Sequence, residues 1–418
     1  MHQSMRRSLS IVAVASFAVL GLAACSTSST TEASSVKSLT LWESQSTPKA
    51  VVAAVKAYKK ASGVTINIVT VPDSFDTNVA TKWAAGQRPD LIFYQSSPGA
   101  LAKLNPKKNL VDLGKLPFVK KTKFGLANSG VVDGVHYTAT YDFPSVYGVF
   151  YSKSVFAKAG ISVPTSIAEL NTAAAKLKAA GEIPLQLTGG DVWTTQIPFL
   201  IAMTDATKAG IVPKLDSGAV KYTSSTITDG AAISRDWVTK GWTNPDYATA
   251  LYTDVPALLQ SGKIGMYEMP SWMNPSFTGS TSNVGFFAYP SESGAAQWQS
   301  SNNASVQVPK TGSASKEAAA KQFVNYLTVG AGYKAINSAL GSPSIIEGVP
   351  DPQGLSPLNA AAAAAFAKDG IPSFSQLQVY TPSNMPTLLS QVLSGQITPA
   401  QFGAQMQSGV EQLKQLQG

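Results

Sequence analysis

The sequence predicts an α/β protein with two lobes. The chain has 418 residues, which is more than a single hydrophobic core usually covers, so two lobes are the default expectation. Hydrophobic residues make up 44% of the chain and charged residues 13%, as in folded rather than disordered proteins. Within the first hundred residues, strand-like and helix-like runs alternate as β-α-β-α-β. This order favours a parallel sheet with helices on its faces.

Residues 1–25 have the features of a secretion signal. Two arginines are followed by an apolar run, Leu9 to Leu20, which is too short to span a bilayer as a permanent helix. After the run comes Leu22-Ala23-Ala24-Cys25, which resembles the bacterial lipobox. Acylation of Cys25, with palmitate among the expected chains, would hold the mature protein on the membrane. The alternative is an ordinary signal peptide with an unrelated cysteine. Residues 26–37 are rich in Ser and Thr and predict a flexible tether.

Composition excludes several kinds of partner and cofactor. The formal charge is +8, but the lysines come as isolated pairs and only four arginines are present, so we expect scattered surface charge and no nucleic-acid partner. Cys25 is the only cysteine, so no disulfide can form within the chain. His136 is the only histidine after the leader, which leaves no zinc site of the His/Cys type. No glycine-rich phosphate loop is present, and we expect neither metal nor cofactor.

The elements of the amino-terminal part follow from periodicity and breakers. We expect three strands, which begin at Ser38 or span Val64–Val71 and Leu91–Phe93. Between them we expect two helices, over Pro48–Lys60 and Val79–Ala85. Asp90 is expected to cap the turn after Pro89. The two polar pairs Glu43/Gln45 and Tyr94/Gln95 lie at carboxyl ends of strands, where open α/β sheets bind ligands.

Turn and cap signals organise the middle of the chain. Asp133-Gly134 predicts a hairpin. Ser166 and Glu169 have the spacing of a capping box that opens a helix over about Ile167–Ala180. Helices are also expected over residues 154–159, 194–210, 227–240, 316–328 and 358–368, with a strand over 284–290. Two helices are expected in 380–418, the second capped by Thr398.

Several segments resemble one family when they are read in order. Residues 133–185 contain DGVHYTAT, VFYSKSVFAKAG, VPTSIAEL and AAKLKAAGEIP, and residues 85–93 and 257–266 read AGQRPDLIF and ALLQSGKIGM. Together they closely resemble the extracellular solute-binding proteins of ABC importers, carbohydrate branch. Ser152 replaces the usual Asn and Ile167 the usual Trp, changes that concern packing. The resemblance covers essentially all of the chain after the leader.

The resemblance implies a fold, partners and a location. The fold is the two-lobed periplasmic-binding-protein (type 2) fold, with a ligand cleft and a multi-strand hinge. Lobe I would comprise residues 38–143 plus 291–341, and lobe II residues 144–290 plus 342–418. The protein would be a monomer on the extracytoplasmic face of the cell membrane. It would bind a mono- or oligosaccharide and deliver it to ABC permease subunits.

Sugar chemistry selects the candidate site residues. Aromatic planes stack on the apolar faces of sugar rings, while carboxylates and amides bond the hydroxyls. The sequence places such residues together at strand ends and in loops. The candidate ligand-binding residues are Glu43, Gln45, Tyr94, Gln95, Asp142, Asp191, Trp193, Glu268, Trp272, Trp298, Asn302 and Tyr380. In the maltodextrin-binding relatives, segments that match Tyr94, Trp193, Trp272 and Tyr380 carry ligand-contacting aromatic residues.

Each assignment has an alternative. Tryptophans are often core residues, and we expect this for Trp237 and Trp242, whereas Trp42 fits either core or cleft. Asp142 and Glu268 could instead serve as surface or hinge hydrogen-bonding groups. The ligand could be a polyol or a glycerol-phosphate type of solute. A glycoside-active enzyme would need two carboxylates across the scissile bond, but nothing marks such a pair here. A purely structural surface lipoprotein would have no cleft.

Overall fold

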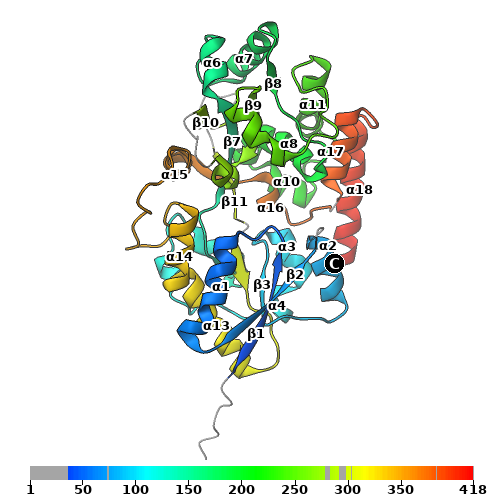
Figure 1. Cartoon of the computed structure of the whole chain (residues 1–418). Coiled ribbons are helices and arrows are strands. Elements are labelled where there is room, and N and C mark those ends of the chain that lie inside the picture. Colours follow the sequence, from blue (N-terminus) through cyan, green and yellow to red (C-terminus); the bar gives the residue numbers. More distant parts are fainter. Residues whose placement is uncertain are drawn as a thin grey trace, which may run out of the picture. The chain divides into compact units, whose positions relative to one another are not determined.

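The computed structural model describes residues 36–72, 75–277, 283–290, 298–302, 304–382 and 384–417. The predicted leader, Cys25 and most of the tether lie outside these residues. Two large β-sheets, each covered by helices, form the two lobes that the length predicted (Figure 1). The fold class is confirmed as α/β. No helix in the described ranges has both the length and the apolar character needed to cross a bilayer.

The first lobe is built on a five-stranded sheet in the order β2-β1-β3-β12-β6. Its strands are β1 (Ser38–Ser44), β2 (Thr65–Val71), β3 (Leu91–Phe93), β6 (Ala139–Thr140) and β12 (Ser305–Gln307). The first three are parallel, with β1 and β2 in register along their whole length. β12 runs antiparallel to both of its neighbours. The predicted β-α-β-α-β order is therefore confirmed.

Helices cover both faces of this sheet. α1 (Lys49–Ser62), α13 (Ala314–Thr328) and α14 (Ala331–Leu340) pack together over Leu39 and Leu41 of β1. α2 (Phe75–Ala84) and α3 (Pro98–Leu104) lie on the opposite face with Trp42. Successive side chains of a strand point to opposite faces, which sends Trp42 away from Leu41. Trp42 is 7% exposed and packs in the core, which decides between its two alternatives.

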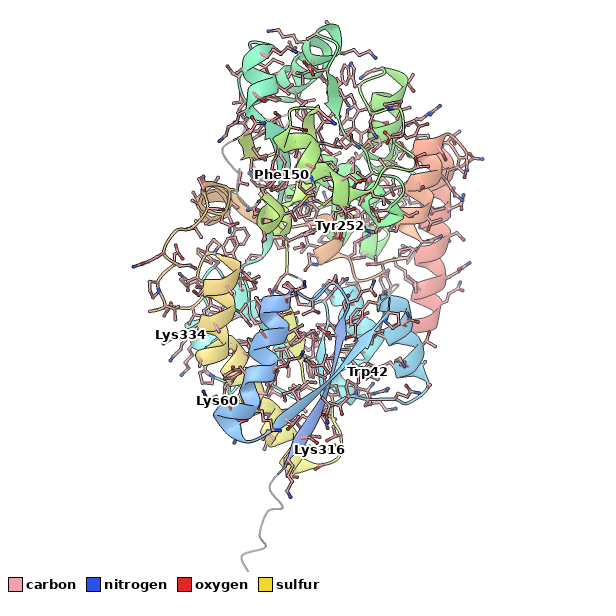
Figure 2. All side chains as sticks on the ribbon, viewed as in Figure 1. Trp42, Lys60, Phe150, Tyr252, Lys316 and Lys334 are labelled. Atoms are coloured by element: carbon pink, nitrogen blue, oxygen red, sulfur yellow. The ribbon has the colours of Figure 1, made fainter. Side chains whose placement is uncertain are left out.

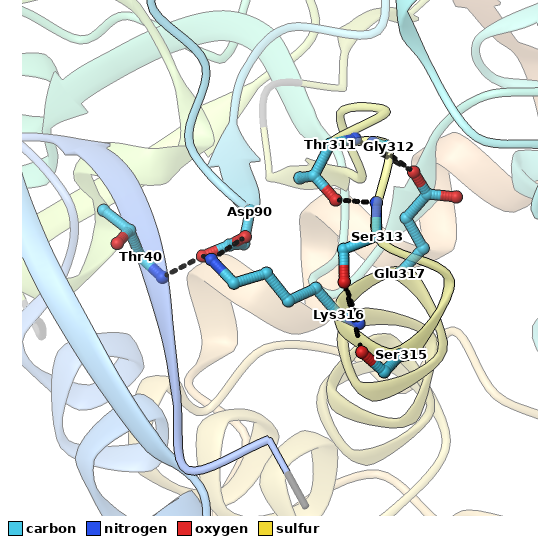
Figure 3. A network of polar contacts seen from close by, with 8 residues as sticks. All are labelled: Thr40, Asp90, Thr311, Gly312, Ser313, Ser315, Lys316 and Glu317. Atoms are coloured by element: carbon cyan, nitrogen blue, oxygen red, sulfur yellow. Dashed lines mark hydrogen bonds and ion pairs between the residues drawn. The ribbon is translucent and has the colours of Figure 1, made fainter. Parts of the chain in front are cut away.

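Asp90 joins three elements of the first lobe (Figure 3). Its carboxylate accepts a hydrogen bond from the backbone N–H of Thr40 in β1 at 2.8 Å and pairs with the Lys316 Nζ of α13 at 3.1 Å. The prediction of a local cap after Pro89 is therefore incomplete, because both partners are distant in sequence. Glu317 completes the network by accepting from the backbone N–H groups of Thr311 and Gly312.

A small layer of short elements extends the first lobe. It comprises α4 (Pro106–Asn109), α5 (Phe118–Lys121), η1 (Leu126–Asn128), β4 (Val131–Val132) and β5 (Val135–His136). The strands β4 and β5 form the predicted hairpin around Asp133 and Gly134. Both turn residues have positive φ, 48° and 78°, as a two-residue hairpin turn of this kind requires.

The second lobe is built on a sheet in the order β13-β11-β7-β9-β8, with β10 also paired to β7. Its strands are β7 (Ser145–Ser152), β8 (Ile183–Leu185), β9 (Ile264–Pro270), β10 (Val284–Phe287), β11 (Trp298–Ser301) and β13 (Gly370–Pro372). The long strand β7 is central and almost fully buried. A Cβ at Gly148 would lie 2.6 Å from the Phe286 ring, so glycine allows that ring to cross the strand.

The helices of the second lobe enclose the larger hydrophobic core. They are α6 (Lys153–Lys158), α7 (Ile167–Ala179), α8 (Gln196–Ala202), α9 (Thr204–Lys208), α10 (Ile211–Ser217), α11 (Ser225–Thr239), α12 (Val255–Gln260), α15 (Pro357–Asp369), α16 (Phe374–Leu377), α17 (Met385–Ser394) and α18 (Pro399–Gln417). Three short helical turns complete the lobe, η2 (Val192–Thr195), η3 (Tyr252–Asp254) and η4 (Ser271–Phe277). Trp237 is 4% exposed in this core, as predicted, and Trp242 packs at its margin.

Two predicted helix caps form. The Ser166 Oγ accepts from the Glu169 backbone N–H at 3.2 Å, and the Thr398 Oγ1 accepts from the Gln401 backbone N–H at 3.2 Å. In the first of these, the Glu169 carboxylate accepts from the backbone N–H of Thr165, one residue before the expected partner.

Three connections join the lobes within the described ranges: β6 to β7, β11 to β12, and α14 to α15. The first follows β6. The positions of the other two depend on contacts between elements, and the lobe boundaries expected from the sequence stay a prediction. β11 pairs with β7 and so belongs to the second sheet, and Ile345 and Ile346 pack against Leu126 and Phe143 beside the first sheet. Strand pairing and packing, which the local sequence does not encode, set both positions.

Candidate ligand-binding site

Three aromatic rings gather in the loops of the second lobe. Trp193 lies in η2, Tyr252 in η3 (labelled in Figure 2) and Trp272 in η4. The ring centroids are 5.3 Å apart for Trp193 and Tyr252, 5.8 Å for Tyr252 and Trp272, and 6.0 Å for the two tryptophans. Trp193 is 37% exposed and Trp272 42% exposed. We call these three residues the aromatic platform, since they offer solvent a large apolar surface.

The predicted carboxylate Asp191 supports this platform. Its Oδ2 accepts a hydrogen bond from the backbone N–H of Tyr252 at 2.9 Å. The side chain is half-buried. Asp191 therefore holds the platform together through at least one of its oxygens.

Glu268 lies inside the second lobe, on β9. It is 5% exposed, and neither carboxylate oxygen has a hydrogen-bond partner. Burial raises the pKa of this carboxyl to about 8. It lines a cavity of about 10 Å³ together with Gln186 and Ser234, beneath α8, α11 and α17. The side chain is thus a neutral acid at pH 7, within the lobe.

Glu43 and Asp142 lie close to one phenol in the first lobe. Burial raises the pKa of Tyr141 first of all, and the charges of Asp142 and Glu43 raise it further. Glu43 accepts a hydrogen bond from the Thr70 Oγ1 at 2.9 Å. Asp142 accepts from the Phe143 backbone N–H at 2.8 Å, and burial raises its pKa to about 6. Asp142 sits where the chain leaves β6 for β7, so it belongs to the hinge region.

Asn302, which follows β11, forms hydrogen bonds with residues of the first lobe. Its Nδ2 donates to the Thr140 Oγ1 at 2.6 Å, and its backbone carbonyl accepts from the Ser96 Oγ at 2.9 Å. Asn302 also lines a cavity of about 310 Å³. Residues 96–101 and 124–131 of the first lobe and 300–302 and 366–377 of the second supply most of the other walls. No platform residue lines this cavity.

The remaining predicted residues lie in different settings. Tyr94 is 2% exposed and packs near Phe75 in the first lobe. Gln45 is exposed at the end of β1, and Gln95 is half-buried after β3. Tyr380 is half-buried, with the Lys414 Nζ 5.2 Å from its ring centroid. The side chain of Trp298 lies outside the described residues.

The family of the chain follows from comparison with known proteins. Residues 42–331 match the family described as bacterial extracellular solute-binding protein. The chain belongs to this family. Among the curated proteins searched, no sequence matches the chain.

Solved structures of similar fold cover nearly the whole solute-binding chain. A protein described as chitin oligosaccharide binding protein has a TM-score of 0.76 at 24% identity, over 90% of this chain and 98% of that one. RafE in complex with raffinose has a TM-score of 0.73 at 21% identity, over 90% and 99%; RafE comes from Streptococcus pneumoniae. A sugar transporter protein from Bacillus licheniformis in complex with stachyose has a TM-score of 0.71 at 21% identity, over 89% and 98%. At these identities the likeness concerns the fold.

Sequence reasoning missed Tyr252 as a site residue. The candidates were aromatic residues beside polar ones at strand ends and in loops, and Tyr252, in the short turn η3, was not among them. The available signal was the segment Leu251-Tyr252-Thr253-Asp254, in which an aromatic residue precedes an acid in a stretch without periodicity.

The three carboxyl groups that could form a catalytic pair come from different elements. Glu43 lies on β1, Asp142 between β6 and β7, and Glu268 on β9. No group of three or more His, Cys, Asp or Glu residues in the described ranges could hold a metal ion.

Proposed function

We propose that this protein is the extracytoplasmic binding component of an ABC importer and that its ligand is a sugar. The aromatic platform carries the proposal. Two exposed indoles beside a tyrosine match the apolar C–H faces of sugar rings. Burial of the indoles in the core of the lobe would be more favourable for folding, so their exposure supports a role in binding. The related structures that contain raffinose or stachyose support the same class of ligand.

Polar groups at the edges of the two lobes would bond the sugar hydroxyls. Gln45 follows β1 and Gln95 follows β3 in the first lobe, and Asp142 lies between β6 and β7. An unmatched polar group in a closed cleft costs about 1–3 kcal/mol, which gives selectivity among sugars. A ligand that contacts both lobes favours the closed form, because only differential contacts shift such an equilibrium. The closed form then docks on the permease subunits.

The membrane anchor is a separate part of the proposal. Acylation at Cys25 after removal of residues 1–24 would leave the protein lipid-anchored and monomeric on the outer face of the membrane, with residues 26–37 as its tether. Replacing Cys25 by alanine would release the protein from the membrane fraction and abolish labelling with a radioactive fatty acid. Labelling that persists in the Cys25→Ala variant would contradict the anchor.

Calorimetric titration of the purified protein tests the sugar proposal. The panel should contain monosaccharides, raffinose, stachyose, chitin oligosaccharides, a linear polyol and glycerol 3-phosphate. We expect heat from at least one saccharide and an intact saccharide afterwards. Heat from the polyol or glycerol 3-phosphate alone would identify another solute class, and cleavage of a saccharide would point to a glycoside-active enzyme.

A further inference from the structure

Two loops of the second lobe are bonded to each other beneath the aromatic platform. The Gly189 backbone N–H donates to the Tyr247 carbonyl at 2.7 Å, and the Gly190 backbone N–H donates to the Ala250 carbonyl at 3.1 Å. The Asp191 carboxylate then accepts from the Tyr252 backbone N–H at 2.9 Å. We call the contact between residues 188–193 and 247–252 the loop clasp.

The glycines of the clasp are required by close approach. A Cβ on Gly189 would lie 2.7 Å from the Tyr247 carbonyl oxygen, and one on Gly190 would lie 2.5 Å from the Thr249 carbonyl oxygen. Real Cβ atoms do not tolerate such contacts with backbone. The segment Thr188-Gly189-Gly190-Asp191 therefore brings the two backbones together, two residues before Trp193 on one loop and close to Tyr252 on the other.

Asn244 connects the loop of residues 247–252 to the end of β8. Its Oδ1 accepts from the Leu187 backbone N–H at 2.8 Å, and its Nδ2 donates to the Leu187 carbonyl at 3.1 Å and to the Asp246 carboxylate at 2.8 Å. Asn244 is 2% exposed. The clasp is therefore anchored to the strand end of β8, a rigid part of the second sheet.

Tyr252 lies against both indoles. Its ring meets Trp193 at an interplanar angle of 72° and Trp272 at 76°, both edge-on. The two indole planes are tilted by 44° from each other. The tilt points the planes of the two indoles in different directions, and both indoles are partly exposed. The platform thus offers two indoles as candidate stacking surfaces.

We propose that Asp191 and Tyr252 are positioning residues that hold Trp193 and Trp272 for two linked sugar rings, so that the site favours oligosaccharides over monosaccharides. This inference rests on the proposed function. A single ring stacks on one indole only, whereas a second linked ring reaches the other indole without a further loss of translational freedom. Asp191 acts through the Tyr252 backbone, and Tyr252 acts through the indoles.

The test compares raffinose and chitotriose with galactose and N-acetylglucosamine in calorimetric titrations. The wild type should bind one of the trisaccharides at least about tenfold more tightly than the corresponding monosaccharide. Tyr252→Ala and Asp191→Ala should bring this ratio close to one, mainly by weakening the trisaccharide. Tyr252→Phe keeps the ring, and Asp191→Asn keeps an acceptor for the Tyr252 N–H, so both should preserve the ratio.

Three results would overturn the inference. These are equal wild-type affinity for trisaccharide and monosaccharide, an unchanged ratio in both alanine variants, and a Tyr252→Phe variant as defective as Tyr252→Ala. The last would mean that the phenol hydroxyl itself bonds the ligand.

A second measurement needs no sugar and separates this inference from the proposed function. Two indoles 6.0 Å apart couple electronically and give a circular dichroism couplet that Trp193→Phe removes. Tyr252→Ala and Asp191→Ala should reduce this couplet, while Tyr252→Phe and Asp191→Asn retain it. If no sugar binds, the proposed function fails and the selectivity inference with it, and the couplet then reports on the positioning alone. An unchanged couplet in both alanine variants contradicts the positioning roles.

Discussion

Trp272 presents 42% of its surface to solvent, although it is part of a cluster of three rings. If the platform stacks on a sugar, Trp272→Ala removes one of its two indole faces. We expect the affinity for the best saccharide of the panel to fall about ten- to a hundredfold, as for truncation of a central aromatic residue at an interface. Calorimetric titration measures this change.

Val192→Ala is the matched control for that prediction. Val192 is also 42% exposed and is adjacent to Trp193, but it is not one of the three rings. Its truncation should change the affinity less than about threefold. Equal effects of Val192→Ala and Trp272→Ala would place the ligand elsewhere on the protein.

The buried carboxyl of Glu268 makes the stability of the second lobe depend on pH. Burial raises its pKa from 4.5 to about 8, so the folded protein keeps this proton to a higher pH than the unfolded chain does. Unfolding releases the proton between these values, so this group lowers stability as pH rises from about 4.5 to 8. Glu268→Gln should abolish that decline and raise stability at pH 9 by on the order of 3 kcal/mol.

Denaturant unfolding from pH 5 to pH 9 checks the Glu268 prediction. Glu347→Gln, at an exposed position, is the control and should leave the pH profile unchanged. Profiles of the wild type and Glu268→Gln that run parallel over this range would show that the folded-state carboxyl titrates in its ordinary range.

Local context was decisive for the exposure of two tryptophans. Trp193 and Trp272 lie near glycine or proline in loops, and both are exposed rather than packed in the core, while their contact with a ligand stays a prediction. The role of Asp191 could not be predicted in this way, because its partner Tyr252 is 61 residues away. The burial of Glu268 was not predictable either, because it results from the packing of α8, α11 and α17 over β9. That packing is a property of the whole lobe.

At the scale of elements, local sequence signals correctly predicted the presence of many helices and strands and which of the two each segment forms. The parallel strands of the first lobe, the hairpin at Asp133 and the caps at Ser166 and Thr398 follow from alternation, turn residues and capping spacing. Strand partners were not predictable to the same degree. Residues 298–301 carry no strand alternation, and they form β11 because β7 and β13 offer pairing on either side.

Asp90 is the side chain on which three elements of the first lobe depend. Asp90→Ala leaves the part-buried Thr40 N–H without its side-chain acceptor and should cost about 2 kcal/mol of unfolding free energy. Asp90→Asn keeps an acceptor and should cost about half as much. Lys316→Ala removes only a half-exposed ion pair and should cost less than about 1 kcal/mol.

Denaturant unfolding of the three variants gives this ranking directly. If Lys316→Ala costs as much as Asp90→Ala, the ion pair rather than the hydrogen bond to β1 is the main contribution. The test is informative because both partners come from α13 and β1, which the sequence separates widely.

At the scale of the whole molecule, three connections between two separately cored lobes allow one lobe to rotate against the other. If the proposed ligand contacts both lobes, saturating sugar should shift the population to the closed form. We expect the radius of gyration from small-angle X-ray scattering to fall by about 1 Å with ligand. Trp272→Ala at the same sugar concentration should show a smaller fall.

A scattering profile unchanged by a sugar that binds in calorimetry would contradict closure, though not binding. The existence of two lobes was predictable from chain length, whereas local sequence patterns carry little information on where the chain crosses between them. The positions of these crossings depend on which sheet captures β11 and on the packing of residues 345–346 beside Leu126.

All three rings of the platform belong to loops of the second lobe. An incoming sugar can therefore bind to a preformed surface of the second lobe before it contacts the first lobe. Association should proceed in two kinetic phases: an encounter whose rate grows with sugar concentration, then a slower phase independent of it. Stopped-flow tryptophan fluorescence resolves the two. A poorly matched sugar can dissociate from the open complex before the slower phase begins. Which sugars reach the closed form then depends on their dissociation rate from the second lobe as well as on their fit to the closed cleft.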